Sequence, residues 1–182
     1  MWPGPGVSYT ATTMPASHIV ALDPASAEHV QAARELFGEI ALTLPSALQD
    51  SAFASERAQL PGDYVLPGGI LLLAHVDGVL AGYGALRPCP GTDYPNACEI
   101  KRLYVRPAMR RLGLGRELAL ELIDRAREAG YSVVLLDTFS ETEAVRGLYA
   151  DLGFESIEPY YFNPVAGSHY FKIDLDDLIS RF

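Results

Sequence analysis

Apolar residues recur along this chain in two rhythms, one typical of strands and one typical of helices. A strand is expected over 18–22, and apolar positions at helical spacing then run from Val30 to Leu44. Asp23-Pro24 before them reads as an N-cap with proline at the first helical position. A second, less periodic helix is expected over 47–60, ended by Pro61-Gly62. The predicted order is a strand followed by two helices.

The next segment is typical of antiparallel strands. Apolar runs over 70–76 and 79–87 flank Asp77-Gly78, which favours a tight hairpin turn. After a loop rich in proline and glycine, a further strand is expected over 98–105. These three strands are predicted to pair antiparallel.

The second half of the chain predicts a helix that crosses between parallel strands. Over 114–129 the apolar positions form one helical face that packs on a sheet, and Gly130 ends the helix. The nearly continuous apolar run 133–137 is typical of a buried parallel strand. Ser140-x-x-Glu143 is a capping-box pattern for another helix that ends at Gly153. Strands over 154–157 and 169–175 complete the expected sheet.

The stretch 110–115, Arg-Arg-Leu-Gly-Leu-Gly, stands between the 98–105 strand and the 114–129 helix. A helix start leaves backbone N–H groups unpaired, and glycine lets an anion approach them closely. No Ser, Thr, Asp or Asn occupies the usual capping position. Eight of the chain's 14 Lys and Arg residues lie from Lys101 to Arg127. The pattern therefore predicts an anion site, although a tight turn followed by a solvated arginine face is the alternative.

Three landmarks in this region resemble one known family. Arg110-x-x-Gly113-x-Gly115 matches the [Q/R]-x-x-G-x-[G/A] signature of the GCN5-related N-acetyltransferase (GNAT) superfamily. The run 103–107 is similar to the strand and V-x-P that precede this signature, and 148–154 resembles the family's L-Y-x-x-x-G-F. The resemblance covers 97–154 and is weaker elsewhere. It implies an α/β (α+β) fold with a mixed, mostly antiparallel central sheet of six to seven strands and about four helices.

The resemblance also implies a reaction and a cofactor. The chain is expected to be an N-acetyltransferase that moves an acetyl group from acetyl-CoA directly to a primary amine of a small molecule. The alternatives are a peptide or protein amine as acceptor, or a non-catalytic acyl-CoA-binding sensor domain. In the family the glycine loop holds the pyrophosphate, and the preceding strand holds the pantetheine and thioester. The implied cofactor-binding residues are Leu103, Tyr104, Val105, Arg110, Arg111, Leu112, Gly113, Leu114, Gly115 and Arg116.

Acetyl transfer needs a neutral amine, a stabilised oxyanion and a proton for the departing thiolate. By resemblance Tyr149 holds the general-acid position; a core tyrosine is the alternative. Glu99 is the candidate general base, because it lies eleven residues before Arg110, the spacing at which some members of the family it resembles place a glutamate base. Burial would have to raise its pKa. A surface glutamate on an edge-like strand is the alternative. The oxyanion donor would be a backbone N–H near Leu103 or Tyr104. Side chains that could face the acceptor are Tyr64, Arg102, Asp137, Tyr160, Tyr161 and Asn163.

Composition narrows the remaining choices. The 182 residues suit a flexible tail over 1–17 and a single domain over 18–182. A net charge of −9 and a pI near 4.8 argue against nucleic acid and fit a cationic acceptor better. An acidic surface that serves only solubility is the alternative explanation of this charge. Neither a secretory signal nor a membrane-spanning run is recognisable, which predicts a cytoplasmic protein with no membrane partner. Cys89 and Cys98 are expected to be reduced in that compartment, and a hairpin disulfide between them is the alternative. The cysteines and four histidines offer no metal-ligand spacing, so no metal is expected. The resemblance makes a homodimer conceivable.

Overall fold

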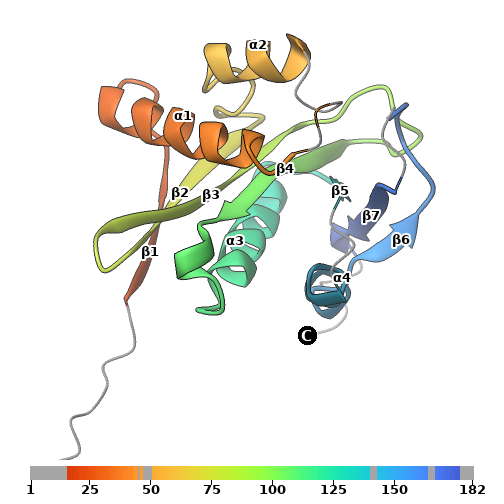
Figure 1. Ribbon diagram of the computed structural model, residues 1–182. Helices are drawn as coiled ribbons and strands as arrows, with labels where there is room; N and C mark the ends of the chain where they lie inside the picture. The colour runs from red at the N-terminus through yellow and green to blue at the C-terminus, as the bar shows by residue number, and fades with distance from the viewer. Residues whose placement is uncertain (1–15, 45, 47–50, 140–142, 164–166, 177–182) are drawn as a thin grey trace, which may run out of the picture.

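The computed structural model describes residues 16–44, 46, 51–139, 143–163 and 167–176. Within these ranges, seven strands form one sheet in the order β1-β2-β3-β4-β5-β7-β6 (Figure 1). The strands are β1 (Ser17–Ala21), β2 (Ile70–Val76), β3 (Val79–Pro88), β4 (Ala97–Val105), β5 (Val133–Thr138), β6 (Glu155–Ile157) and β7 (His169–Asp174). The α-helices are α1 (Ala27–Ala41), α2 (Ser51–Gln59), α3 (Leu114–Glu128) and α4 (Glu143–Asp151). The predicted sheet size, helix number and fold class are confirmed.

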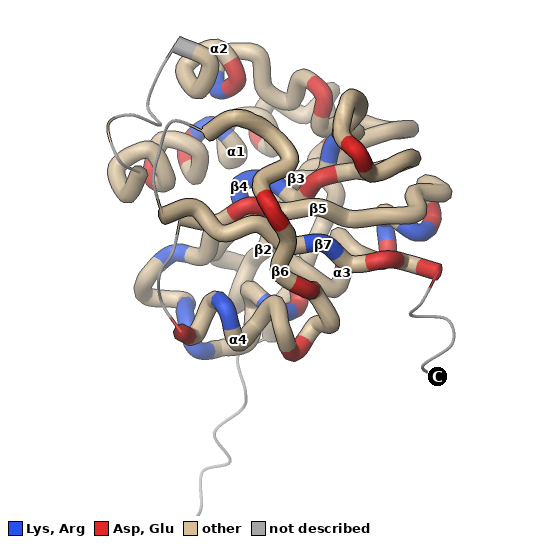
Figure 2. The backbone as a smooth tube through the Cα atoms, turned by 90° about the vertical axis from the view of Figure 1, so that its right-hand side faces the viewer, with Lys and Arg blue, Asp and Glu red and all other residues tan. Residues whose placement is uncertain are grey.

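The strand directions also match the sequence pattern. β1 to β4 pair antiparallel in chain order, β4 and β5 are parallel, and β7 is antiparallel to both β5 and β6. The buried run in β5 and the helix α3 before it form the predicted parallel crossover. The helices lie in two layers, with α1 and α2 over one face of the sheet and α3 and α4 over the other (Figures 1 and 2).

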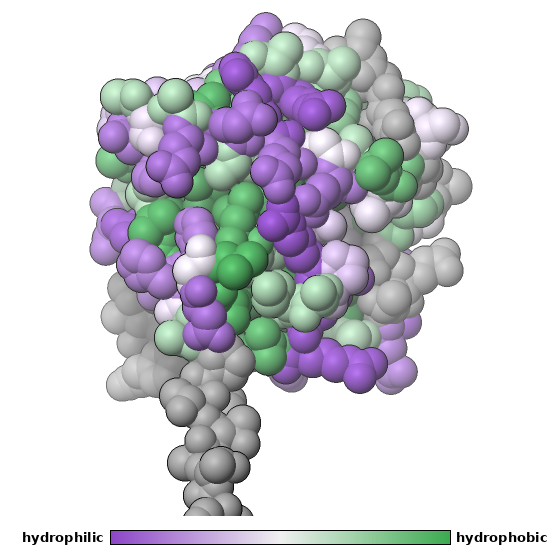
Figure 3. Space-filling model, turned by 60° about the vertical axis from the view of Figure 1, so that its left-hand side comes forward, coloured by the Kyte–Doolittle hydropathy of each residue, from purple (hydrophilic) through white to green (hydrophobic). Residues whose placement is uncertain are grey.

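Each face of the sheet has its own apolar core. Leu118, Leu122 and Ala126 of α3 pack on one face together with alternate residues of β2, β4 and β5. On the other face, Leu36 and Phe37 of α1 join a second cluster with residues of α2, β2 and β3. Alternating side chains of one strand thus serve both cores. Polar residues cover much of the face shown in Figure 3, with hydrophobic residues exposed between them.

The predicted start of the first helix is wrong. The N-cap of α1 is Ser26, whose Oγ accepts a hydrogen bond from the N–H of His29, so Asp23 is not the cap. The Asp23 carboxylate instead accepts from the N–H of Ala25, and its carbonyl accepts from Ser26. Asp23 therefore forms a turn that precedes the helix. The helix also ends at Ala41, so Leu44 lies beyond it.

The other helix boundaries agree where the structure describes them. α3 begins at Leu114 without a side-chain cap, as predicted, and Gly130 follows its end with φ 81°. The capping-box residues 140–142, the helix start predicted at 47 and residues 1–15 of the predicted tail lie outside the described residues. Ser17 already belongs to β1, one residue before the predicted domain start. None of the described helices is long and apolar enough to cross a membrane.

Candidate active site

The parallel strands β4 and β5 separate at the middle of the sheet. Their pairing runs from Ala97–Val133 to Ile100–Leu136, and β4 then continues to Val105 with no described strand paired to it on that side. The gap between the two strands joins the face covered by α1 and α2 to the face covered by α3 and α4. A substrate from each face can therefore meet at this gap.

A β-bulge in β4 lies at the same place. Lys101 pairs with Ala85 and Tyr104 with Tyr83, so two residues of β4 stand opposite Gly84 alone. Arg102 has φ 60°, a left-handed backbone conformation that non-glycine residues seldom adopt. The extra residue places the side chains of Lys101 and Arg102 both toward α1 and α2, whereas Leu103 packs in the core beneath α3. The bulge thus directs two adjacent cations to one face.

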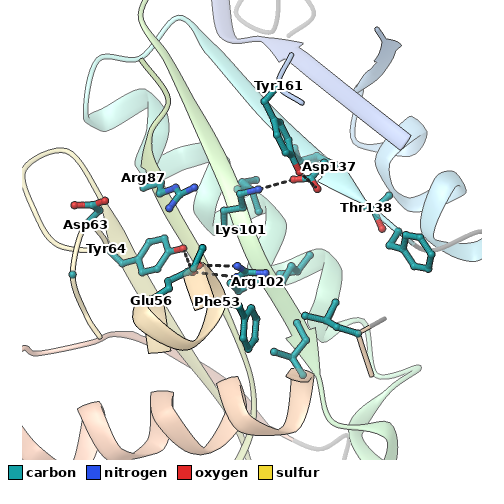
Figure 4. Close-up of a pocket in the computed structure, with 18 of the residues that line it drawn as sticks. Phe53, Glu56, Asp63, Tyr64, Arg87, Lys101, Arg102, Asp137, Thr138 and Tyr161 are labelled. Atoms are coloured by element: carbon teal, nitrogen blue, oxygen red, sulfur yellow. Dashed lines mark hydrogen bonds and ion pairs between the residues drawn. The ribbon is translucent and has the colours of Figure 1, made fainter. Parts of the chain in front are cut away.

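A cavity of about 660 Å³ occupies the gap and extends beneath α2 (Figure 4). Residues of the two strand ends line it, including Leu103 from β4 and Leu136 from β5. Tyr149 of α4 lines it from the α3 and α4 side. Phe53 and Tyr64 line it from the other side. The cavity therefore passes through the sheet and meets both layers of helices.

On the α2 side, Glu56 is the centre of a partly buried polar network. Its two oxygens accept hydrogen bonds from Arg102 Nε (3.1 Å) and Nη2 (2.7 Å), and Tyr64 also donates to it. The Arg102 guanidinium lies 4.7 Å from the ring centroid of Phe53. Burial by itself would raise the pKa of Glu56, but the charge and hydrogen bonds of Arg102 lower it below its usual value. Figure 4 shows these side chains pointing toward one another, so the network ties α2 to β4.

On the β5 side, an ion pair spans the gap between the strands. Lys101 Nζ lies 2.8 Å from Asp137 Oδ1, and Tyr161 donates to Asp137 Oδ2 at 2.8 Å (Figure 4). Burial by itself would raise the pKa of Asp137, but the charge of Lys101 and both hydrogen bonds lower it. Asp137 is therefore an ionised group at the point where the strands part.

Glu99 lies next to these residues but outside the lining of the cavity. It is 5% exposed on a central strand, so the alternative of a surface glutamate on an edge-like strand is wrong. Arg87 binds its Oε1 through Nε and Nη2, both at 2.7 Å, and Lys101 lies 3.4 Å from its Oε2. Tyr160 also donates to Oε2, at 3.3 Å. Arg87 and Lys101 line the cavity and Glu99 does not, so the general-base role of Glu99 stays a prediction.

Tyr149 is 6% exposed, and its ring packs against Phe154 and Phe171, with centroids 5.6 and 5.7 Å away. The residue lines the cavity, and its hydroxyl makes no hydrogen bond to another residue in the described part of the chain. Burial, with a smaller contribution from Asp137, raises the pKa of Tyr149 to about 12. The phenol is therefore protonated at neutral pH, which a proton donor requires.

The loop before α3 presents a run of free backbone donors. Gly113 is the N-cap with φ 80°, and a Cβ there would meet nothing within 4 Å. Among the described residues, the N–H groups of residues 111–115 have no acceptor. Consecutive N–H groups at a helix N-terminus form an anion-binding site. The geometry agrees with the predicted pyrophosphate loop, although the residues of this loop do not line the cavity.

Most of the nearby cations are already neutralised. Arg106 pairs with Glu35 and Glu39, and Arg125 pairs with Glu121. Lys101, Arg102 and Arg127 have carboxylate partners as well. Within the described ranges, Arg110, Arg111 and Arg116 form no ion pair with a carboxylate. The anion site suggested by the whole run 101–127 is thus restricted to these three arginines and the N–H groups beside them.

The predicted cofactor-binding residues of β4 lie on opposite faces of the sheet. Leu103 lines the cavity and Val105 packs beside it on the α3 side. The Tyr104 side chain lies on the opposite face, where its hydroxyl donates to Glu39 at 3.3 Å, so only its backbone can serve the cofactor there. Arg110 donates through Nε to the carbonyl of Val105 at 3.0 Å.

Of the side chains expected to face the acceptor, Tyr64, Arg102, Asp137, Tyr161 and Asn163 line the cavity, whereas Tyr160 does not. Sequence reasoning missed Glu56 and Arg87. The one available signal was the pair Lys101-Arg102, which breaks the alternation of the strand. No cluster of three or more His, Cys, Asp or Glu able to hold a metal occurs among the described residues, and Cys89 and Cys98 are free thiols.

Comparisons with known proteins agree with this arrangement. The sequence model of the Acetyltransferase (GNAT) family matches residues 33–154. An uncharacterized N-acetyltransferase of Schizosaccharomyces pombe is 40% identical over 113 residues, which are 62% of this chain and 68% of that relative. A GNAT acetyltransferase structure from Staphylococcus aureus has a TM-score of 0.68 at 18% identity, covering 88% of this chain and 99% of that one. The structure of yncA, a putative acetyltransferase from Salmonella typhimurium with its cofactor acetyl-CoA, has a TM-score of 0.62 at 25% identity, covering 88% and 95%.

The fold matches solved acetyltransferase structures and the relatives are N-acetyltransferases, so the chain is an acetyltransferase. The family match is more specific, and the chain belongs to the GNAT family of acetyltransferases.

Proposed function

We propose that this protein transfers an acetyl group from acetyl-CoA directly to a primary amine of a small molecule. The observation that supports the proposal is the cavity that passes through the gap between β4 and β5. It is lined by Tyr149 on one face of the sheet and by polar side chains on the other. In this proposal the N–H groups and arginines of residues 110–116 hold the pyrophosphate. Leu103 to Val105 hold the pantetheine arm, as in the resemblance described above.

The chemistry then proceeds in a ternary complex. The amine enters from the α2 side, loses its proton and attacks the thioester carbonyl at the gap. A backbone N–H of the bulge near Leu103 or Tyr104 stabilises the oxyanion. The carbon–sulfur bond breaks, and Tyr149 gives its proton to the departing thiolate. Glu99 is the proposed proton acceptor, and because it does not line the cavity, the proton reaches it through water.

The cavity volume of about 660 Å³ is in the range of sites that bind small molecules, which supports a small acceptor. A relative from Escherichia coli, named L-amino acid N-acyltransferase MnaT, is 33% identical over 89 residues, which are 49% of this chain and 52% of that relative. The substrate in its name is an L-amino acid, which is a small molecule with an amine. A peptide or protein amine is the second candidate acceptor, because Phe162 at the cavity mouth is 90% exposed and could contact a larger partner. Cytoplasmic location and homodimer formation stay predictions.

The test is release of CoA thiol from acetyl-CoA across amino acids, polyamines, aminoglycosides, arylamines and short peptides, with product masses recorded. Turnover of one small-molecule class is expected. Turnover of peptides alone would favour the second candidate. Acetyl-CoA binding without turnover of any amine would indicate a sensor domain, and absence of binding would contradict the cofactor site.

A further inference from the structure

Two guanidinium groups flank Tyr64 on the acceptor side of the cavity. Arg87 Cζ lies 6.0 Å from the centroid of the Tyr64 ring, and the Tyr64 hydroxyl donates to Glu56, which also binds Arg102. Both arginines line the cavity, with side chains 31% and 21% exposed (Figure 4). They come from β3 and β4 and are fixed by separate carboxylates, so their positions are set before any substrate binds.

Each guanidinium uses only part of its donor set. Arg87 binds Glu99 through Nε and Nη2, and Arg102 binds Glu56 through the same two atoms. Nη1 of either arginine makes no hydrogen bond to another residue within the described ranges. In those ranges, the Tyr83 hydroxyl is the only fully buried polar side-chain atom that lacks a hydrogen-bond partner. The two Nη1 atoms also lack a partner there, so neither of them can be fully buried. Both Nη1 atoms are therefore accessible donors.

The carboxylate oxygens on this side of the cavity, by contrast, mostly accept hydrogen bonds already. Both oxygens of Asp137 accept hydrogen bonds, from Lys101 and Tyr161, and both oxygens of Glu56 accept from Arg102. The ion pairs balance, since Arg87 and Lys101 lie against Glu99 and Asp137, and Arg102 against Glu56. The exposed carboxylate of Asp63 at the rim is the exception. The residues that line this side of the cavity therefore offer free N–H donors, and a ligand that binds them needs acceptor oxygens.

A carboxylate is the group that matches such donors. Guanidinium N–H groups bind carboxylates in a planar geometry with charge-assisted hydrogen bonds. An acceptor whose amine lies at the gap beside Asp137 can direct a carboxylate toward Tyr64, between the two arginines. A zwitterion also suits this side of the cavity, where the charges of the ion pairs are balanced, because a zwitterion has no net charge.

We propose that the acceptor is an amine that also carries a carboxylate, and that Arg87 and Arg102 bind this carboxylate while the amine lies at the gap between β4 and β5. The inference rests on the proposed function, since it names the acceptor class of the same site. It assigns specificity to two residues outside the cofactor loop. Both act on the acceptor and not on acetyl-CoA.

The first experiment compares matched acceptors in the full-length protein. Phenylalanine, phenethylamine and phenylalanine methyl ester form one set, and leucine, isopentylamine and leucine methyl ester form another. Each kcat/KM is divided by the fraction of neutral amine at the assay pH, because the three amines differ in pKa. This corrected kcat/KM is expected to be at least tenfold higher for the carboxylated member than for the other two. γ-Aminobutyrate and butylamine extend the comparison to a longer separation of the two groups.

Each outcome separates the two proposals. If amines are acetylated but the decarboxylated amine or the ester is equal to or better than the carboxylated member in every set, the carboxylate assignment is wrong and the proposed function stands. If no amine is acetylated by protein that binds acetyl-CoA, the proposed function fails, and the acceptor assignment fails with it.

The second experiment tests the two residues. Arg87→Gln and Arg102→Gln are each expected to raise KM for the carboxylated acceptor at least tenfold, with KM for acetyl-CoA and for the decarboxylated amine changed less than twofold. Because Arg102→Gln leaves Glu56 unpaired, the double variant Glu56→Gln/Arg102→Gln restores the charge balance and protects against loss of folding. Arg125→Gln, an arginine paired with Glu121 on the outer face of α3, is the matched control. An equal loss for carboxylated and decarboxylated amines would overturn the assignment.

Discussion

Lys101 Nζ lies 2.8 Å from Asp137 Oδ1, and this ion pair joins β4 to β5 one position beyond Ile100–Leu136, the last residues that the two strands pair. The strands part at this point, and the cavity opens between them. The pair therefore holds the two sides of the gap at a fixed separation, with Tyr161 adding a hydrogen bond from the β6–β7 loop.

The ion pair predicts a pH-dependent loss of stability in Asp137→Asn. The partners of Asp137 lower its pKa in the folded protein below the unfolded value of about 3.9, so its contribution is present above that pH and is lost as the pH falls through the folded pKa. Asp137→Asn is expected to lower the free energy of unfolding by about 1–3 kcal/mol at neutral pH. The difference from the parent should shrink below about pH 4. Urea titrations across this range measure it.

Asp63→Asn is the control for that series. Asp63 lines the same cavity, but it is exposed and forms no ion pair with any described residue. Its substitution should change the free energy of unfolding by less than about 0.5 kcal/mol. Equal destabilisation of the two variants, or a loss in Asp137→Asn that does not depend on pH, would contradict the role given to the ion pair.

Tyr149→Phe is expected to separate catalysis from binding. Removal of the phenolic proton should lower kcat by a factor between about 10² and 10⁴. Acetyl-CoA affinity and thermal stability should be unchanged, since the hydroxyl has no hydrogen-bond partner within the described ranges. Steady-state kinetics and calorimetric titration with acetyl-CoA measure these effects. A variant with full turnover would show that Tyr149 is only a core residue.

The raised pKa of Tyr149 makes a second prediction for the same residue. Because burial, with a contribution from Asp137, raises this pKa to about 12, the phenol keeps its proton throughout the usual assay range. The kcat of the parent enzyme should therefore show no alkaline loss between about pH 7 and 10 that disappears in Tyr149→Phe. An alkaline limb present only in the parent would indicate that the phenol ionises much more readily.

Gly113→Ala tests the pyrophosphate loop, with Gly130→Ala as a matched control. Both glycines have positive φ, 80° and 81°, and neither would bring a Cβ within 4 Å of another group. Each substitution should cost about 1 kcal/mol through backbone strain alone. Only Gly113→Ala should weaken acetyl-CoA binding, because Gly113 lies at the N-terminus of α3 and Gly130 follows its other end. Equal affinities in the two variants would argue against the loop as the cofactor site.

Glu99→Gln tests the proposed base. If Glu99 accepts the proton from the amine, kcat/KM should fall by at least about 10² for every acceptor. Arg87→Gln is the comparison, because it breaks the same ion pair and keeps the carboxylate. With a decarboxylated amine as acceptor, Glu99→Gln should lose far more turnover than Arg87→Gln. Similar losses in the two variants would assign Glu99 a structural role, as the partner that holds Arg87 and Lys101.

The order of the elements could be predicted because each depends on local periodicity. The hairpin 70–87, the helix from Leu114 and the buried strand from Val133 all follow from patterns within about fifteen residues. The start of α1 could not, since Asp23 and Ser26 are both good capping residues. The hydrogen bond from Ala25 to the Asp23 carboxylate, which makes a turn there, is visible only in the structure.

The sequence by itself determined the family, the glycine loop and the position of Tyr149, because these lie in short motifs with fixed spacing. Only the tertiary structure decided which charges are available. Arg102 is neutralised by Glu56 and Lys101 by Asp137, residues 46 and 36 positions away in the chain. Such pairs depend on how α2 and β5 pack beside β4 and on the bulge at Arg102. The acceptor side of the cavity is assembled from these distant segments, and no local pattern in the sequence records their meeting.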